Sequence, residues 1–441
     1  MRIRKGMVGA AAIVMAISTA AWADDQFSSY SSDLTTQNAP DPVLATPIDT
    51  AAPTAGAPVL ADAAPEMPLM NGLDKLGIGG LMESAGINAY GYVEVGYSYD
   101  ATVPHNLTGP KQFPGNLIFF PGPDKNKFIL DQVDLTLERL VDATKGKFDI
   151  GFRVEAYYGR DAVFTHSNGI LDNTNKDGSG EDQQLDLEQA YLTFAIPVGS
   201  GLTVKAGKFD TLLGYETINP TSNAFYTHSY LFSYAVPFTQ TGVLGSYTLN
   251  DQWAVTAGIT RGWNQSTSDN NGEPDFLGQA VWTFSSAWTL TGNLSVGPQA
   301  FKDNKDYFVV PEIISQYKVS DALSLNGDFV YGFANNIAQW AGAAGYVDYT
   351  LNKQLTPNLR VEFYHDGHGA TTGAGDGSDV NYWEFTANLE ITPVPDDQYL
   401  QWLKIRPEVR YDIADQGAFD FNGTSGKSSQ LTFAVDATYQ F

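Results

Sequence analysis

Pairs of charged residues recur at a spacing of two in segments that otherwise alternate polar and apolar side chains. Residues two apart on a β-strand point to the same face, so Arg153 and Glu155, for example, share one face of an expected strand. Charges of both signs on a wet face can steer and select ions through their field. We therefore expect a pore to be lined or narrowed by Arg153, Glu155, Lys205, Lys208, Glu216, Arg360, Glu362, Arg406, Glu408 and Arg410.

Three stretches carry partial metal-binding patterns. His365 and His368 have a spacing found in metal sites, but they lie beside a Gly-rich loop with no third ligand in view. Residues 173–178 resemble the first half of an EF-hand loop, yet Gln184 stands where a bidentate Glu is needed. The stretch 366–379 could also collect divalent cations. We expect polar surface loops at all three places, and we expect neither a metal site nor a cofactor.

A hydrolase would need a serine, a histidine and an orienting polar group within reach of one another. His228 and Ser229 are the candidates, but adjacent residues on a strand point to opposite faces. The chain contains no cysteine, which excludes disulfides, thiolate metal sites and a Cys nucleophile. We expect no catalytic residues and treat a barrel hydrolase as a remote alternative.

The last thirteen residues, 429–441, alternate between an apolar face, which begins at Leu431, and a polar face on which only Ala434 is ambiguous, and they end on the aromatic Phe441. A period of two over this length predicts a strand long enough to cross a membrane. The same alternation returns repeatedly from Asn88 onward and gives about sixteen strands, although 14 or 18 would also fit. We predict an all-β fold: a transmembrane, antiparallel, up-and-down β-barrel.

Short turns and long polar loops alternate between the expected strands. Turns such as 199–200, 250–251 and 320–321 interleave with the loops 100–126, 159–182, 264–275, 366–379 and 413–428. This asymmetry is typical of outer-membrane barrels, whose periplasmic turns are short. A soluble β-sandwich would bury the apolar faces between two sheets instead. A barrel of sixteen strands is too wide for side chains to fill, so its lumen holds water.

The amino-terminal part predicts export. A basic start (Arg2, Arg4, Lys5), an apolar core and an A-x-A motif at 21–23 predict a signal peptide over residues 1–23, with a retained anchor helix as the alternative. Residues 24–88 form an Ala/Pro-rich linker, in which 69–87 fit a short helix at the barrel mouth or a flexible lead-in. The barrel spans 89–441. The excess of Asp+Glu (50) over Lys+Arg (25) excludes a nucleic-acid-binding surface.

Residues 211–242 interrupt the alternating pattern. The stretch is aromatic, partly apolar and broken by Pro220 and Pro237. An exposed loop would be more polar, so we expect this segment to fold inward and narrow the lumen. We also expect Glu216 to lie opposite Lys205 or Lys208 across the constriction. An ordinary strand pair with a packed outer loop is the alternative.

The segment G-K-F-D-T-L-L-G-Y-E (207–216), followed by Pro237, Gly242 and G-W-N (262–264), resembles the OmpL-like family of outer-membrane β-barrel porins. The stretches 90–94 and 360–366 are similar to that family too. The resemblance covers most of 88–441. It implies a Gram-negative outer-membrane location and passive transport, and it brings neither an established substrate nor catalytic residues.

These observations together predict an outer-membrane porin that passes small hydrophilic solutes or ions, with outer-membrane lipid around it. A non-conducting anchor or adhesin with a plugged lumen is the alternative. The negative total charge favours cations, whereas lysines such as Lys205 and Lys208 could reverse the preference locally. Porins of this size often form homotrimers, but no stretch of the sequence identifies an interface.

Overall fold

The computed structural model describes residues 67–101, 128–171, 183–334, 338–373, 377–419 and 427–441. The predicted signal peptide, most of the linker and the EF-hand-like stretch 173–178 lie outside these residues. Within the described part of the chain, no helix has the length and apolar character needed to cross a membrane.

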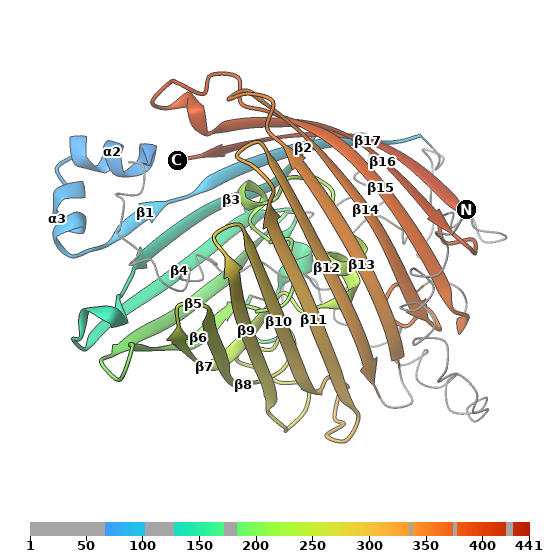
Figure 1. The fold of residues 1–441 in the computed structure, drawn as a ribbon, viewed down its shortest axis with the longest axis horizontal. Coiled ribbons are helices and arrows are strands. Elements are labelled where there is room, and N and C mark those ends of the chain that lie inside the picture. The colour runs from blue at the N-terminus through green and yellow to red at the C-terminus, as the bar shows by residue number, and fades with distance from the viewer. Residues whose placement is uncertain (1–66, 102–127, 172–182, 335–337, 374–376, 420–426) are drawn as a thin grey trace. The chain divides into compact units, whose positions relative to one another are not determined.

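The described residues form one antiparallel sheet that closes into a barrel (Figure 1). Each strand from β2 to β16 pairs with its successor, and β17 pairs with β2. The short β1 continues into β2 after Gly91 and also pairs with β3, so the barrel has sixteen strands, which confirms the prediction. The strands are β1 (Asn88–Tyr90), β2 (Tyr92–Asp100), β3 (Phe128–Arg139), β4 (Asp149–Gly159), β5 (Gln184–Ile196), β6 (Leu202–Asp210), β7 (Thr239–Asn250), β8 (Trp253–Thr260), β9 (Asp275–Ser285), β10 (Trp288–Pro298), β11 (Tyr307–Lys318), β12 (Leu323–Ala334), β13 (Ala338–Tyr349), β14 (Leu355–Gly367), β15 (Val380–Ile391), β16 (Leu403–Ala414) and β17 (Ser429–Gln440).

The two ends of the barrel wall meet at Gly91. Its N–H donates to the carbonyl of Phe441, and the N–H of Phe441 donates to the carbonyl of Gly91, each over 2.9 Å. A Cβ at position 91 would lie 2.2 Å from the backbone oxygen of Asp134. Only glycine fits at this close approach of three segments.

The two faces of the wall differ in the way a membrane barrel requires. On β14, Leu359 and Val361 point outward and are 44% and 36% exposed, whereas Arg360 and Glu362 point inward and are buried. Apolar side chains on an outward face are stable when lipid covers them, and the closed ladder leaves no unpaired edge there. The alternation read from the sequence therefore assigns the outward and inward faces correctly.

Aromatic residues gather where strands meet the short turns. Trp253 and Trp282 stack with ring centroids 5.4 Å apart. Phe284 lies 5.2 Å from Trp282 and 5.0 Å from Trp288. Such girdles mark the level of the lipid head groups. The cluster includes Trp253 and Trp288, the first residues of β8 and β10.

Most connections on one rim are short, and most of those on the other are longer, as the sequence predicts. Two short helices, α2 (Pro68–Lys75) and α3 (Gly79–Ser84), lie at the short-turn rim. Lys75 donates to the hydroxyl of Tyr399 over 3.2 Å, and Arg139 donates to the carbonyl of Ala85 over 3.1 Å. These contacts place the helices beside the rim.

The remaining elements are short. They are the 3-10 turn η1 (Ala143–Lys145) in the β3–β4 connection, the helix α4 (Ala162–Thr165) after β4, and the 3-10 turn η6 (Leu400–Trp402) before β16. Two more, η3 (Pro220–Ser222) and the π-helical turn η4 (Leu231–Ala235), belong to the connection between β6 and β7.

Candidate pore constriction

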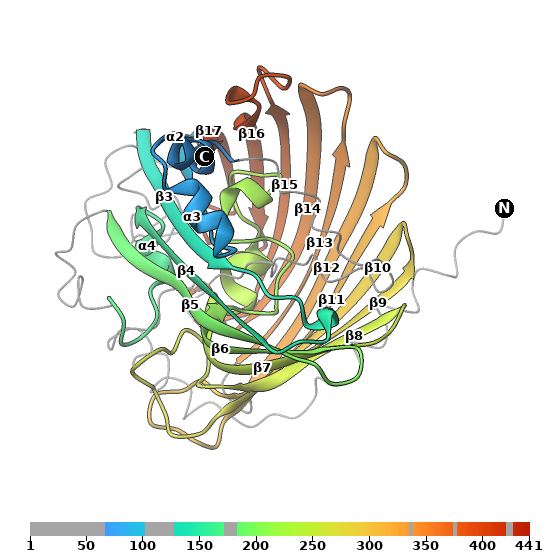
Figure 2. The same cartoon turned by 90° about the vertical axis from the view of Figure 1, so that its left-hand side faces the viewer.

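The connection between β6 and β7, residues 211–238, lies inside the barrel (Figure 2). We call it the inserted segment. Most of its apolar residues are buried, and Leu213, Ile218 and Phe238 are all 0% exposed. The indole of Trp340, on the inner face of β13, donates to the carbonyl of Ala235 over 3.1 Å. The inward fold expected from the composition of this stretch is confirmed.

Apolar packing fixes one side of the inserted segment. Leu212, Leu213, Leu231 and Val236 join a cluster with inward-facing residues of the wall, among them Val310 on β11, Val330 on β12 and Tyr364 on β14. These side chains leave water only when the segment crosses the lumen, so their burial stabilises the inward position. The aromatic and apolar composition of 211–238 therefore has a direct physical role.

Carboxylates of the wall bind the backbone of the inserted segment. Irregular backbone inside a barrel needs partners for its N–H groups, since β-sheet and helix partners are missing there. Four wall carboxylates accept six such N–H groups: Glu312 from Gly214 (2.8 Å), Asp328 from Tyr215 (3.3 Å), Glu408 from Tyr226 (3.0 Å) and Thr227 (3.2 Å), and Glu362 from Tyr230 and Leu231 (2.7 Å each). We call these four residues the carboxylate anchors.

Arginines of the wall bind the carbonyl groups of the same segment. Arg406 donates to the carbonyls of Pro220 and Asn223 over 2.9 and 2.6 Å, and Arg360 donates to that of Thr227 over 2.7 Å. Arg410 donates to the carbonyl of His228. The wall thus satisfies both donors and acceptors of the segment's backbone, and this pairing keeps the polar groups stable under burial.

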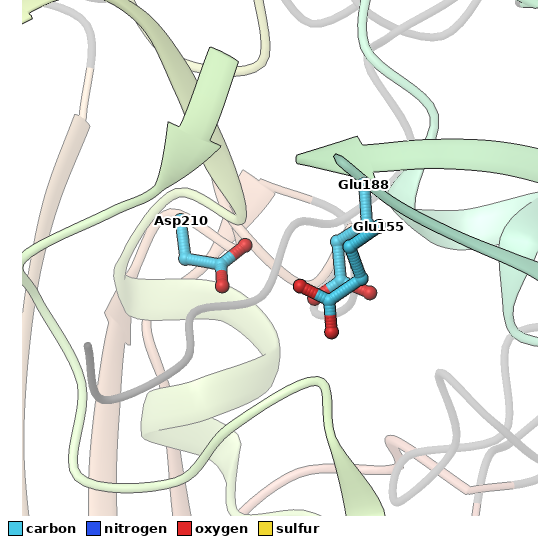
Figure 3. Close-up of side chains that lie close together, drawn as sticks. All are labelled: Glu155, Glu188 and Asp210. Atoms are coloured by element: carbon cyan, nitrogen blue, oxygen red, sulfur yellow. The ribbon is translucent and has the colours of Figure 1, made fainter. Parts of the chain in front are cut away.

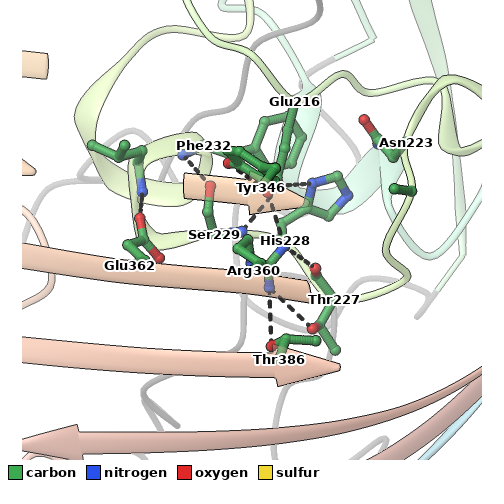
Figure 4. Close-up of polar contacts among 12 residues, drawn as sticks. Glu216, Asn223, Thr227, His228, Ser229, Phe232, Tyr346, Arg360, Glu362 and Thr386 are labelled. Atoms are coloured by element: carbon green, nitrogen blue, oxygen red, sulfur yellow. Dashed lines mark hydrogen bonds and ion pairs between the residues drawn. The ribbon is translucent and has the colours of Figure 1, made fainter. Parts of the chain in front are cut away.

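Glu216 is the one carboxylate of the inserted segment itself, and it lies among the wall arginines and carboxylates that bind the segment (Figure 4). We call this group of charged residues the charged cluster. It accepts hydrogen bonds from Arg360 (2.8 Å), the hydroxyl of Tyr346 (3.0 Å) and the N–H of Ser229 (3.0 Å). The imidazole Nδ1 of His228 lies 3.0 Å from the same carboxylate. Burial opposes ionisation, but Arg360 and His228 outweigh it and lower the pKa of Glu216 to about 2.

His228 stays neutral in this environment. Burial lowers its pKa to about 4, and the nearby Arg360 and Arg406 act in the same direction, while Glu216 opposes them. Its ring stacks on Phe232, with centroids 3.6 Å apart. The hydroxyl oxygen of Ser229 accepts the N–H of Phe232. The His228 imidazole and the Ser229 hydroxyl thus have separate partners, which gives no support to a hydrolytic pair.

The acidic partners of the arginines complete the cluster. Arg360 pairs with Glu384 (3.1 Å), Arg406 with Glu94 (3.2 Å) and Asp436, and Arg410 with Asp412 (2.9 Å). Arg360 also lies over the ring of Phe225, and Arg410 over that of Tyr230. Every one of these arginines is 0–1% exposed.

Seven of the ten sequence-predicted site residues, on strands β4, β14 and β16, fall into two groups. Arg360, Glu362, Arg406, Glu408 and Arg410 face inward from β14 and β16 and are covered by the inserted segment. On β4, Arg153 pairs with Glu155 (2.9 Å) and with Glu138 (3.7 Å). The first group holds the constriction, whereas Arg153 and Glu155 belong to the opposite part of the wall.

The expected partner of Glu216 is wrong. Glu216 contacts Arg360 and His228, while Lys208 pairs with Asp186 (3.4 Å) and Lys205 lies over the ring of Tyr191, 4.4 Å from its centroid. Both lysines sit on β6 at the base of the inserted segment, and the chain carries Glu216 away from them toward β14. Lys205 and Lys208 are close to Glu216 in the sequence, but this closeness does not determine which residue Glu216 contacts in the folded chain.

Three wall residues that contact the inserted segment are not identified from the sequence: Glu312, Asp328 and Asp412. Glu312 and Asp328 lie on strands whose alternation is weak in sequence, and Asp412 extends the charged row of β16 by one step. The row Arg406, Glu408, Arg410 and Asp412 keeps a spacing of two, so continuing the period would have found Asp412. The other two have no comparable signal, because their role depends on where the inserted segment crosses.

The comparisons with known proteins agree with this architecture. The family model described as "Putative beta-barrel porin-2, OmpL-like" matches residues 86–441. A comparison with curated proteins gave no match. Among solved structures, the chain is similar to the outer membrane channel DcaP of Acinetobacter baumannii, at 16% identity and a TM-score of 0.51, over 80% of this chain and 97% of that one.

Two porins of other bacteria show the same likeness. The anion-selective porin from Comamonas acidovorans is 10% identical, with a TM-score of 0.52 over 80% of this chain and 99% of that one. OmpF of Salmonella typhi, described in complex with daunomycin, is 12% identical, with a TM-score of 0.51 over 80% and 97%. Identities this low show the fold alone. Because the family model covers the entire barrel and the fold agrees with it, the chain belongs to the OmpL-like β-barrel porins and is a porin of the outer membrane.

Proposed function

We propose that the protein lets small hydrophilic solutes or ions diffuse passively through the barrel, past the constriction made by the inserted segment. The observation that carries the proposal is the closed sixteen-stranded wall with a polar inner face, crossed by the inserted segment, which the wall binds through its backbone. A wide barrel with such a face holds water. The inserted segment narrows that water column, which favours small solutes.

Partly exposed polar residues on the inner face support a passage beside the constriction. Toward the short-turn rim, Thr256 on β8 and Asp348 on β13 are partly exposed, and Lys404 and Glu390 form an ion pair whose side chains are 32% and 17% exposed. Lys205 on β6 is also partly exposed. Charges of both signs along this part of the wall could tune ion preference through their local field.

Single-channel recording in a planar bilayer tests the proposal. The protein should give stepwise conductance that scales with salt concentration. The absence of cysteine from the chain allows a sharper test with single introduced cysteines. A cationic thiosulfonate reagent should reduce the conductance of Thr256→Cys, whose side chain faces inward, and should leave that of Ala257→Cys, which faces lipid, unchanged. Equal responses of the two variants would contradict the proposal.

A non-conducting anchor barrel is the second candidate, and one observation favours it. Arg360, Arg406 and Arg410 are almost fully buried beneath the inserted segment, so a large part of the inner wall is closed to water. This candidate predicts a folded protein that inserts into bilayers without conductance steps. The recording described above separates the two, because a silent but correctly folded barrel supports the anchor.

Passive diffusion requires no catalytic residue, and we include the absence of catalysis in the proposal. Assembly into a homotrimer, which the size of the chain suggests, is a further part of it. The mass of the protein in detergent, measured by light scattering with the detergent contribution subtracted, tests the assembly. A monomer mass would contradict the trimer and leave the channel proposal intact.

A further inference from the structure

A second cluster of charged residues lies on the wall opposite the carboxylate anchors. Glu155 on β4, Glu188 on β5 and Asp210 at the end of β6 each offer one carboxylate oxygen, and these oxygens lie within 4.8 Å of one another (Figure 3). Figure 3 shows the carboxylates of Glu155 and Glu188 side by side and that of Asp210 turned toward them. All three residues are buried.

Glu188 distinguishes this group from an ordinary patch of acidic residues. It is 1% exposed, and neither of its carboxylate oxygens has a hydrogen-bond partner among the described residues. A buried polar group without a partner carries a large desolvation penalty, and an ionised carboxylate carries a larger one. The side chain points to the centre of the cluster, where a bound cation would supply the missing interaction.

The surroundings of Glu188 add negative charge. Asp134 and Asp186 are close enough to repel its carboxylate, as are Glu155 and Asp210. Among the described residues, Arg153 forms ion pairs with Glu155 and Glu138, and Lys208 forms one with Asp186. None of these ion pairs involves Glu188. Buried charges of one sign need a counter-charge to persist.

We propose that Glu155, Glu188 and Asp210 form a binding site for a divalent cation of the size and oxygen preference of Ca²⁺. Calcium binds carboxylate oxygens at about 2.3–2.6 Å, so oxygens on opposite sides of the ion lie about 5 Å apart, and a spread within 4.8 Å fits. Both hydrogen bonds to Glu155, from Arg153 and Gln189, end on Oε2. We assign its other oxygen, Oε1, as the ligand of the proposed site.

The site has a structural consequence for the constriction. The three ligands come from three neighbouring strands, and Asp210 directly precedes the first residue of the inserted segment, Thr211. A bound cation ties β4, β5 and β6 together at the base of that segment. Calcium should therefore stabilise the constriction at one end, while the carboxylate anchors on the far wall hold its middle.

Terbium luminescence tests the site directly. Tb³⁺ occupies calcium sites and emits when a nearby tyrosine is excited, and Tyr92 and Tyr157 are close enough to feel the charge of Glu188. The full-length protein, purified in detergent and freed of metal with EDTA, should show saturable tyrosine-sensitised emission that Ca²⁺ reverses in competition. Calcium should also raise the temperature at which the barrel unfolds.

The variants Glu188→Gln and Asp210→Asn should raise the Kd for Tb³⁺ about tenfold or more, since each removes a charged ligand. Asp275→Asn is the matched control, because Asp275 is a buried carboxylate at the end of β9 outside the cluster. Gel mobility before and after heating shows that each variant is folded. Two results would overturn the proposal: saturable binding that both ligand variants retain, or no binding of Tb³⁺ or Ca²⁺ to the wild type at millimolar concentration. In either case bound protons, rather than a cation, would neutralise the three carboxylates.

Discussion

Arg360 on β14 donates from Nη1 to Oε1 of Glu216 over 2.8 Å, although the two residues are 144 positions apart in the chain. The arginine is 0% exposed and the glutamate 5%, so neither charge can be satisfied by water. Removing one partner of a buried pair leaves the other uncompensated and costs about 3–5 kcal/mol. This contact joins the inserted segment to the wall.

Arg360→Met should lower the free energy of unfolding by an amount in this range, since Glu216 and Glu384 both lose their ion pair with Arg360. Urea unfolding of the barrel in lipid vesicles, followed by tryptophan fluorescence, measures the change. Lys404→Met is the control: its pair with Glu390 is partly exposed, and such pairs contribute about 1 kcal/mol or less. Equal effects of the two substitutions would show that the buried pair has no special role.

Glu362→Ala should loosen the inserted segment at η4. The substitution leaves the N–H groups of Tyr230 and Leu231 without their acceptor, at a cost of about 1–3 kcal/mol for each buried donor. We expect larger and noisier single-channel currents than in the wild type. Thr356→Ala, a change on the same strand near the short-turn rim, serves as the control. Wild-type currents from Glu362→Ala would mean that the segment does not limit conduction.

Acid should destabilise the constriction through His228. Its pKa falls from 6.5 in the unfolded chain to about 4 in the folded state, because burial and the neighbouring arginines disfavour the charged ring. Between these values the unfolded chain binds more protons, so stability is lost as the pH falls from about 6.5 to 4, by about 3 kcal/mol in total. Glu216 contributes in the same direction only at lower pH, since its pKa is about 2.

Urea midpoints measured across this pH range in lipid vesicles test the expectation, and His228→Gln should flatten the slope between pH 6.5 and 4. A variant that keeps the slope of the wild type would assign the pH dependence to other groups.

Ion preference should respond to Lys205 more cleanly than to Lys208. Lys205 is partly exposed on the inner wall, so Lys205→Glu should shift the reversal potential under a salt gradient toward cation selectivity. Lys208 is 3% exposed and pairs with Asp186, so Lys208→Glu should place two negative charges together and reduce folding yield. An unchanged reversal potential in Lys205→Glu would place the selective part of the passage elsewhere.

Gly91→Ala should impair closure of the barrel. Its Cβ would meet backbone oxygen at 2.2 Å, where β1, β3 and the carboxy terminus converge and the backbone cannot yield. Gly292→Ala on β10 is the matched control, because a Cβ at that position has nothing within 4 Å. Gel mobility with and without heating measures the folded fraction. Equal folded fractions of the two variants would show that the close approach at Gly91 can relax.

The strands of the barrel wall can be predicted well from the sequence, because successive side chains of a strand point to opposite faces. Val361 and Glu362 are assigned to opposite faces by alternation alone, and the same rule yields the strand number and the two kinds of rim. The inward course of residues 211–238 was also predictable, since no exposed loop would keep Phe225 and Leu231 in water.

The contacts inside the barrel could not be predicted in the same way. Glu216 meets Arg360 because the inserted segment crosses the lumen at one particular angle, and no periodicity encodes that angle. Glu188 shows the same limit: its neighbours Glu155 and Asp210 come together only through the register of three strands, which includes a shift between β4 and β5. Such juxtapositions depend on tertiary structure.

The carboxylate anchors recognise main-chain N–H groups, which every amino acid except proline provides. Substitutions in the inserted segment can therefore change the side chains next to the water column without changing the hydrogen bonds between the carboxylate anchors and the main chain. A lineage of such proteins could acquire new solute preferences by point mutation at this crossing while its scaffold stays constant, and a protein engineer could use the same freedom.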